Sequence, residues 1–183
     1  MGHLPIQNRD RAPKQSPDPT HGYPQIYKHD RNNGLAILVS AAIISVLALV
    51  TLGGTVRVTE SGLGCPDWPL CHGSLIAPAG FHTWIEFSHR LVATVVAFFV
   101  FSATVFAYKV NRGPSHTRAA LLLASILVVV EILVGGLTVL TELPPATVTV
   151  HLGIAQLIFA SLMLALVPLF LPRPTPLPVG SPL

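Results

Sequence analysis

Two histidines, His89 and His151, each lie near the start of a long apolar stretch of the sequence. The two stretches are predicted to cross a membrane in the same direction, so both imidazoles should lie at a similar depth in a helix bundle. Two neutral imidazoles at one depth suit the two axial positions of a haem iron. Zinc usually takes four ligands, and neither Cys nor Asp stands at this depth to complete the set. The alternative is hydrogen bonding within the bundle, although ionisable residues in membrane spans are more often functional.

Glu86 and Arg90 flank His89 and add charge to the same region. Glu86 precedes His89 by three residues, a spacing that places both side chains on one helix face. A carboxylate there can orient the imidazole, act as a base, or stabilise a developing cation. Alternatively, it caps the N-terminal end of the helix. For Arg90 the two interpretations are pairing with a haem propionate and extension to the membrane surface.

Cys65 and Cys71 are the two cysteines of the chain, and both precede the Glu86 segment in a polar stretch. In an oxidising compartment they should form a disulfide that closes a short loop. Such a bridge is either a structural staple or, if exposed and labile, a redox-active pair. The spacing is not Cys-x-x-Cys, which favours the structural role.

The elements that must position these residues are transmembrane helices. Of the 183 residues 51% are hydrophobic and only 10% are charged, whereas soluble domains carry about 25% charged residues. This composition excludes a disordered protein, a coiled coil, and a nucleic-acid binder with a basic face. Four apolar stretches, each long enough to cross a bilayer, predict an all-α membrane protein, a four-transmembrane-helix bundle. The expected helices are residues 35–56, 86–108, 119–140 and 148–171.

Charge placement predicts the orientation of this 35–171 membrane domain. Nine of the 11 Lys and Arg residues fall in the N-terminal segment, the 109–118 region or the C-terminal tail. The positive-inside rule therefore predicts cytoplasmic termini and an outer loop over 57–85 that holds the cysteines. Residues 1–34 and 172–183 are expected to be a disordered tail and a Pro-rich tail on the cytoplasmic side. The protein is expected in the cell membrane as a multi-pass protein, with the inner mitochondrial membrane as the less favoured location.

An internal repeat divides the chain into two helix hairpins. Residues 53–60 and 135–142 both begin Gly-Gly and end Thr-Glu, and each is followed by a loop and a helix with an early histidine. The matched positions indicate duplication of a helix pair, with one connecting loop elaborated. Glu131 is the one acidic residue within the third stretch and should be neutral or partnered there.

Residues 53–73 (GGTVRVTESGLGCPDWPLCHG) and 86–90 (EFSHR) together resemble the haem A synthase family. The second Gly-Gly segment over 135–141 and the His151-Leu152-Gly153 segment extend the resemblance, which covers about residues 35–171. It implies oxidation of the C8 methyl group of haem O to the formyl group of haem A for a terminal oxidase. It also implies His89 and His151 as the iron ligands and Glu86 as a residue important for catalysis. The cysteine pair of the family corresponds to Cys65 and Cys71.

Members of this family typically have two four-helix halves. This chain resembles only one of them, the N-terminal half, which holds the substrate site. The resemblance therefore implies a homo-oligomer, with haem b as a further cofactor in the full-length architecture. Small residues in the first and third helices, among them 40–42 and both Gly-Gly pairs, suit such association in lipid. Other implied partners are haem O, membrane lipid, haem O synthase and cytochrome oxidase subunits. Two other functions compete with the enzyme: a haem-binding or delivery protein in oxidase assembly, and a thiol–disulfide redox membrane protein.

Overall fold

The computed structural model describes residues 26–110 and 113–170, with side chains from residue 33 onward. This part of the chain forms four helices: α1 (Ile26–Val58), α2 (Phe81–Lys109), α3 (Ser115–Leu140) and α4 (Pro145–Phe170). All four are long and apolar enough to cross a membrane. The expected all-α membrane bundle is confirmed.

The helices begin earlier than the hydrophobic stretches predict. α1 begins at Ile26 and not at Leu35, so residues 26–34 are helical where the sequence suggested part of a disordered tail. α2 begins at Phe81 and not at Glu86, after a loop shorter than the expected 57–85. Backbone hydrogen bonding continues into polar turns beyond the apolar core, and hydropathy alone does not register those turns. The remainder of both expected tails, residues 1–25 and 172–183, lies outside the described residues.

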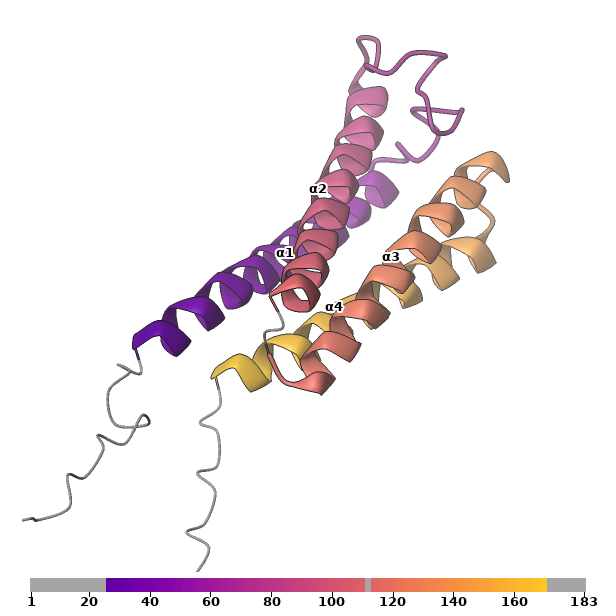
Figure 1. Ribbon diagram of the computed structural model, residues 1–183. Helices are drawn as coiled ribbons and strands as arrows, with labels where there is room; N and C mark the ends of the chain where they lie inside the picture. Colours follow the sequence, from indigo (N-terminus) through magenta and orange to yellow (C-terminus); the bar gives the residue numbers. More distant parts are fainter. Residues whose placement is uncertain (1–25, 111–112, 171–183) are drawn as a thin grey trace, which may run out of the picture.

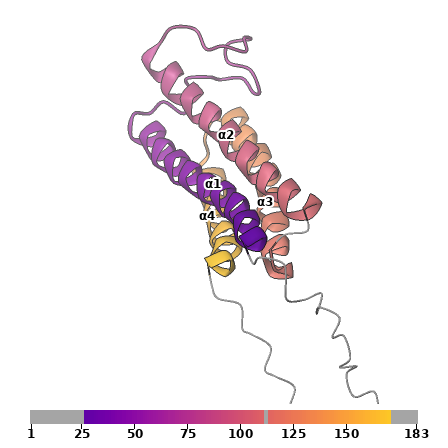
Figure 2. The same ribbon diagram turned by 60° about the vertical axis from the view of Figure 1, so that its left-hand side comes forward.

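The bundle is arranged as two antiparallel hairpins, α1 with α2 and α3 with α4. Further contacts join α1 to α4 and α2 to α3, which leaves α2 and α4 on a diagonal of the bundle. Figure 1 shows the two hairpins separating toward the end that carries the long α1–α2 loop, and Figure 2 shows this loop extending beyond the helices. Histidines on α2 and α4 therefore stand on helices that face each other across the interior.

The fully packed apolar core occupies the end of the bundle away from the long loop. Its members come from all four helices and include Leu35, Val39, Val100, Leu121 and Leu162. On each helix this cluster stops about where the polar residues begin, near Val46 of α1, Val96 of α2, Val128 of α3 and Ile158 of α4. The closely packed end stabilises the fold. The candidate functional residues lie at the other end, beside the α1–α2 loop, where the apolar cluster does not extend.

The two Gly-Gly segments have the same structure as well as similar sequences. At the end of α1 the backbone N–H of Ser61 donates to Val56 O at 2.9 Å, and at the end of α3 the N–H of Leu143 donates to Thr138 O at 2.8 Å. Glu60 and Glu142 both adopt positive φ, 55° and 60°. These bonds satisfy carbonyls that would otherwise end each helix unpaired. The two hairpins therefore repeat in structure as well as in sequence.

Candidate functional site

The two histidines lie at the loop end of the bundle, each against a glycine of the neighbouring helix. A Cβ added at Gly53 of α1 would stand 3.2 Å from His89 Nε2, and one added at Gly135 of α3 would stand 3.0 Å from His151 Cε1. These two glycines are equivalent positions of the repeat. The missing side chains give both imidazoles room against a helix backbone.

Glu131 of α3 points at the second histidine. Its Oε2 atom lies 3.2 Å from His151 Nδ1, with 12% of the Glu131 side chain and 27% of the His151 side chain exposed. Neither atom makes an aligned hydrogen bond in this arrangement, so the contact is one of distance and charge. A carboxylate beside Nδ1 favours the tautomer that leaves Nε2 free to bind a metal. The sequence could not identify this partner for Glu131.

A small cavity lies one helical turn below the histidines. It has a volume of about 40 Å³ and is bordered by all four helices. Ala93 and Ala155, each four residues after a histidine, line it together with Val50 and Glu131. The interior between α2 and α4 is therefore not fully filled at this depth.

The histidine pair has the chemistry of a haem-iron ligand set. Two imidazoles on diagonal helices, each held by a glycine contact, supply the donor set of an axial pair. A tetrapyrrole needs several hundred Å³, so the histidine pair supplies suitable ligands whereas the cavity of about 40 Å³ does not by itself accommodate the macrocycle. Among the described residues, no group of three or more His, Cys, Asp or Glu side chains could hold a metal ion. The donor chemistry fits haem iron better than zinc.

The cysteine loop between α1 and α2 is closed by a disulfide, as the sequence predicts. Cys65 and Cys71 are bonded, and both residues are almost completely buried, at 0% and 1% exposure. Disulfide exchange requires an attacking thiolate to reach a sulfur. Burial therefore opposes the redox-active alternative and favours the structural staple.

Asp67 orders the same loop from within. Its carboxylate accepts the backbone N–H of His72 at 2.6 Å and of Gly73 at 2.7 Å. The hydrogen bond from Gly73 is the largest of the effects that lower the pKa of this carboxyl, and the bond from His72 adds to it. The Asp67 side chain therefore stays charged across the physiological range and holds the turn after Cys71.

Trp68 of the cysteine loop packs against α3. A Cβ added at Gly136 of α3 would stand 2.8 Å from the Trp68 ring, so the indole lies directly against this glycine. The residue is packed against a helix on this side, and 36% of it remains exposed. The loop thereby covers part of the loop end of the bundle.

Arg90 does not reach toward the bundle interior. Its Nε donates to Glu86 Oε1 at 3.1 Å, and its terminal nitrogens donate to three carbonyl oxygens of the cysteine loop. All four hydrogen bonds thus go to groups within the chain, and pairing with a haem propionate is left as the alternative role of Arg90.

Several of the small residues used to predict self-association pack inside the chain. Gly53, Gly135 and Gly136 contact His89, His151 and Trp68, and Ala42 is completely buried. These contacts are internal and do not support an interface between copies, whereas Gly54 is exposed and an added Cβ there would have nothing within 4 Å. The homo-oligomer itself stays a prediction.

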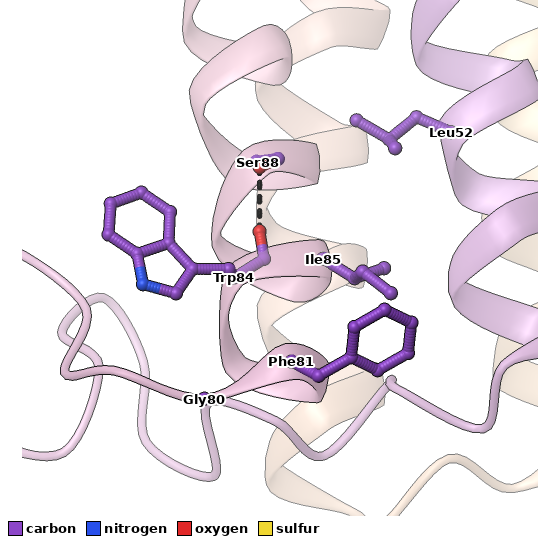
Figure 3. A pocket seen from close by; sticks show the side chains of 6 residues that line it. All are labelled: Leu52, Gly80, Phe81, Trp84, Ile85 and Ser88. Atoms are coloured by element: carbon purple, nitrogen blue, oxygen red, sulfur yellow. Dashed lines mark hydrogen bonds between the residues drawn. The ribbon is translucent and has the colours of Figure 1, made fainter.

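A larger groove of about 390 Å³ lies on another face of α2 and holds none of the site residues. Figure 3 shows Phe81 and Ile85 pointing from α2 toward Leu52 of α1, while Trp84 points away and its carbonyl accepts the Ser88 hydroxyl at 2.6 Å. The groove is open and mainly apolar, as expected for a surface that meets lipid. We place the candidate site on the His89 face.

Gly135 offers a direct test of the histidine contact. Gly135→Ala should lower haem affinity about tenfold, because overpacking costs about 1–3 kcal/mol and the new methyl group would displace His151. Gly153→Ala on α4 is the matched control, since a Cβ there has nothing within 4 Å. Haem titration followed by Soret absorbance measures both. Equal affinities in the two variants would show that His151 does not need its present position.

Comparison with known proteins shows the family of this chain. A family model described as cytochrome oxidase assembly protein matches residues 36–80 and 77–181. A haem A synthase from an Exiguobacterium species is 30% identical over 138 residues, which cover 74% of this chain and 46% of that protein. One from Geobacillus thermodenitrificans is 34% identical over 119 residues, covering 65% and 36%. The chain thus spans less than half the length of these relatives.

The family match covers both hairpins, the cysteine loop and both histidines. The four apolar helices agree with the bacterial relatives in making this a multi-pass protein of the cell membrane. The chain belongs to the haem A synthase family of cytochrome oxidase assembly proteins.

Proposed function

We propose that this protein takes part in haem A biosynthesis by oxidising the C8 methyl group of haem O to the formyl group of haem A. The relatives named haem A synthase support the pathway. The observation that carries the proposal is the histidine pair on diagonal helices, with Glu86 buried one turn away from His89. The haem O substrate would bring its own iron and macrocycle. Conversion of its methyl group to a formyl group removes four electrons and inserts one oxygen atom, so the reaction needs an external electron acceptor and water or dioxygen as the oxygen source.

In this proposal each residue has a separate task. His89 and His151 would bind the iron, and Glu131 would hold the tautomer of His151 from its Nδ1 side. Glu86 lies buried in a position to accept a proton or stabilise positive charge near the reacting methyl group. The cysteine loop covers the loop end of the bundle and limits the entry of water.

The distribution of Lys and Arg supports the proposed orientation, with both termini in the cytoplasm and the cysteine loop on the outer side, where a disulfide persists. We further propose that the chain receives haem O from haem O synthase and passes its product to cytochrome oxidase subunits. We also propose that it works as a homo-oligomer, and that haem b binds where another copy or another protein supplies a second histidine pair.

The deciding experiment is expression in a host that makes haem O but not haem A, followed by chromatography of the extracted haems. Appearance of haem A, or of its hydroxylated precursor, supports the enzyme. Purified protein carrying only haem O or haem b would instead indicate a binding or delivery protein. Protein with no haem at all would exclude both.

A further inference from the structure

Arg90 joins the candidate catalytic carboxylate to the disulfide loop. The Arg90 Nε donates to Glu86 Oε1 at 3.1 Å. One terminal nitrogen donates to Asp67 O at 2.9 Å and Leu70 O at 2.7 Å, and the other donates to Cys65 O at 2.7 Å. A single guanidinium thus holds four oxygens from two separate parts of the chain.

The loop end of this contact depends on the disulfide. All three carbonyls belong to residues 65–71, the ring that the Cys65–Cys71 bond closes. The two cysteines are buried, and Asp67 fixes the following turn through two further hydrogen bonds. Carbonyls in a closed and pinned ring form a rigid acceptor for the planar guanidinium.

The other end of the contact restrains Glu86. Only 7% of the Glu86 side chain and 17% of the Arg90 side chain are exposed, so water competes little with the pair. With Arg90 fixed by the loop, the carboxylate has one charged partner that sets its direction. An arginine that bound the loop alone, or Glu86 alone, would not connect them.

We propose that Arg90 is a positioning residue through which the disulfide ring fixes the Glu86 carboxylate next to His89. The effect on turnover rests on the proposed function, whereas the connection between the loop and Glu86 does not. Removal of the disulfide should then change the position of the Glu86 carboxylate. The effect would pass through Arg90, because the described hydrogen bonds include none between Glu86 and either cysteine. Lysine should not replace Arg90, because one ammonium group lacks the guanidinium's fork of donors.

The first measurement compares turnover of haem O by Arg90→Gln, Arg90→Lys and the control Arg57→Gln. Arg57 is an exposed arginine at the same end of the bundle. Both Arg90 variants should bind haem normally and lose about 10- to 100-fold in kcat at unchanged KM, since a misplacement of about 1 Å costs this much. Arg57→Gln should stay near the wild-type rate. Weakened haem binding in both Arg90 variants with normal kcat would overturn the proposal in favour of a propionate contact.

The second measurement tests coupling. Cys65→Ser/Cys71→Ser should lower kcat by a similar factor, and adding Arg90→Gln to it should cause little further loss, because both changes break one connection. Losses that multiply would show independent effects and overturn the proposal. If the cysteine variant does not fold, the two Arg90 variants still test the role of the guanidinium. A loss of kcat in Arg90→Lys equal to that in Arg90→Gln supports the proposal, and normal kcat in Arg90→Lys contradicts it.

A third measurement needs no turnover. The carboxyl reagent dicyclohexylcarbodiimide, with mass spectrometry of the labelled peptide, should leave Glu86 largely unmodified in the wild type and Arg57→Gln. Glu86 should become several-fold more reactive in Arg90→Gln and in the cysteine variant. Unchanged reactivity would show that Arg90 does not restrain Glu86. Failure of haem A formation with this labelling pattern intact would overturn the proposed function and leave the connection standing.

Discussion

Glu86→Gln should keep bound haem and lose product formation by about 100- to 1,000-fold, the range found when one electrostatic group is removed from an active site. The amide oxygen of glutamine can still accept the hydrogen bond that Arg90 Nε makes to Glu86 Oε1. The substitution therefore removes the negative charge and the ability to accept a proton while it preserves the contact. Haem content is measured by absorbance and product by chromatography of extracted haems.

The matched control is Glu60→Gln. Glu60 is an exposed carboxylate at the same end of the bundle, just beyond α1. Its loss should leave product formation within about twofold, because surface substitutions are usually close to neutral. Full activity in Glu86→Gln would reduce Glu86 to a structural acceptor for Arg90.

Replacement of either histidine should abolish the low-spin absorption of bis-histidine haem. His89→Ala or His151→Ala leaves the iron with one protein ligand, and six-coordinate ligation then requires water or an added base. Added imidazole should restore part of the low-spin spectrum in each variant, because the removed side chain leaves space at the glycine contact. Spectra are recorded with oxidised and reduced protein.

His116→Ala serves as the control for the ligand variants. His116 is exposed in the first turn of α3, at the opposite end of the bundle from the cysteine loop. Its spectrum should match the wild type. Unaltered spectra in both His89→Ala and His151→Ala would rule out the paired ligands, and imidazole rescue would separate loss of a ligand from loss of the fold.

The sequence alone determined the class of structure. Long uncharged stretches leave few alternatives to transmembrane helices, since an unpaired backbone in lipid costs several kcal/mol per group. The repeated Gly-Gly segments predicted two hairpins, and the placement of Cys65 and Cys71 in one outer loop predicted a disulfide; both are present. Helix starts were wrong by three to nine residues because hydropathy marks the apolar core and not the helix ends.

The partners of the polar side chains were decided only by the tertiary structure. Arg90 binds carbonyls 20 to 25 residues away, and Glu131 meets His151 of the next helix. Local spacing in the sequence limits the helix face on which a residue lies. The contacts that its side chain makes there depend on which loop or neighbouring helix packs against that face. The glycines at 53 and 135 show the same difference: the sequence revealed that they repeat, and only packing revealed that each makes room for a histidine.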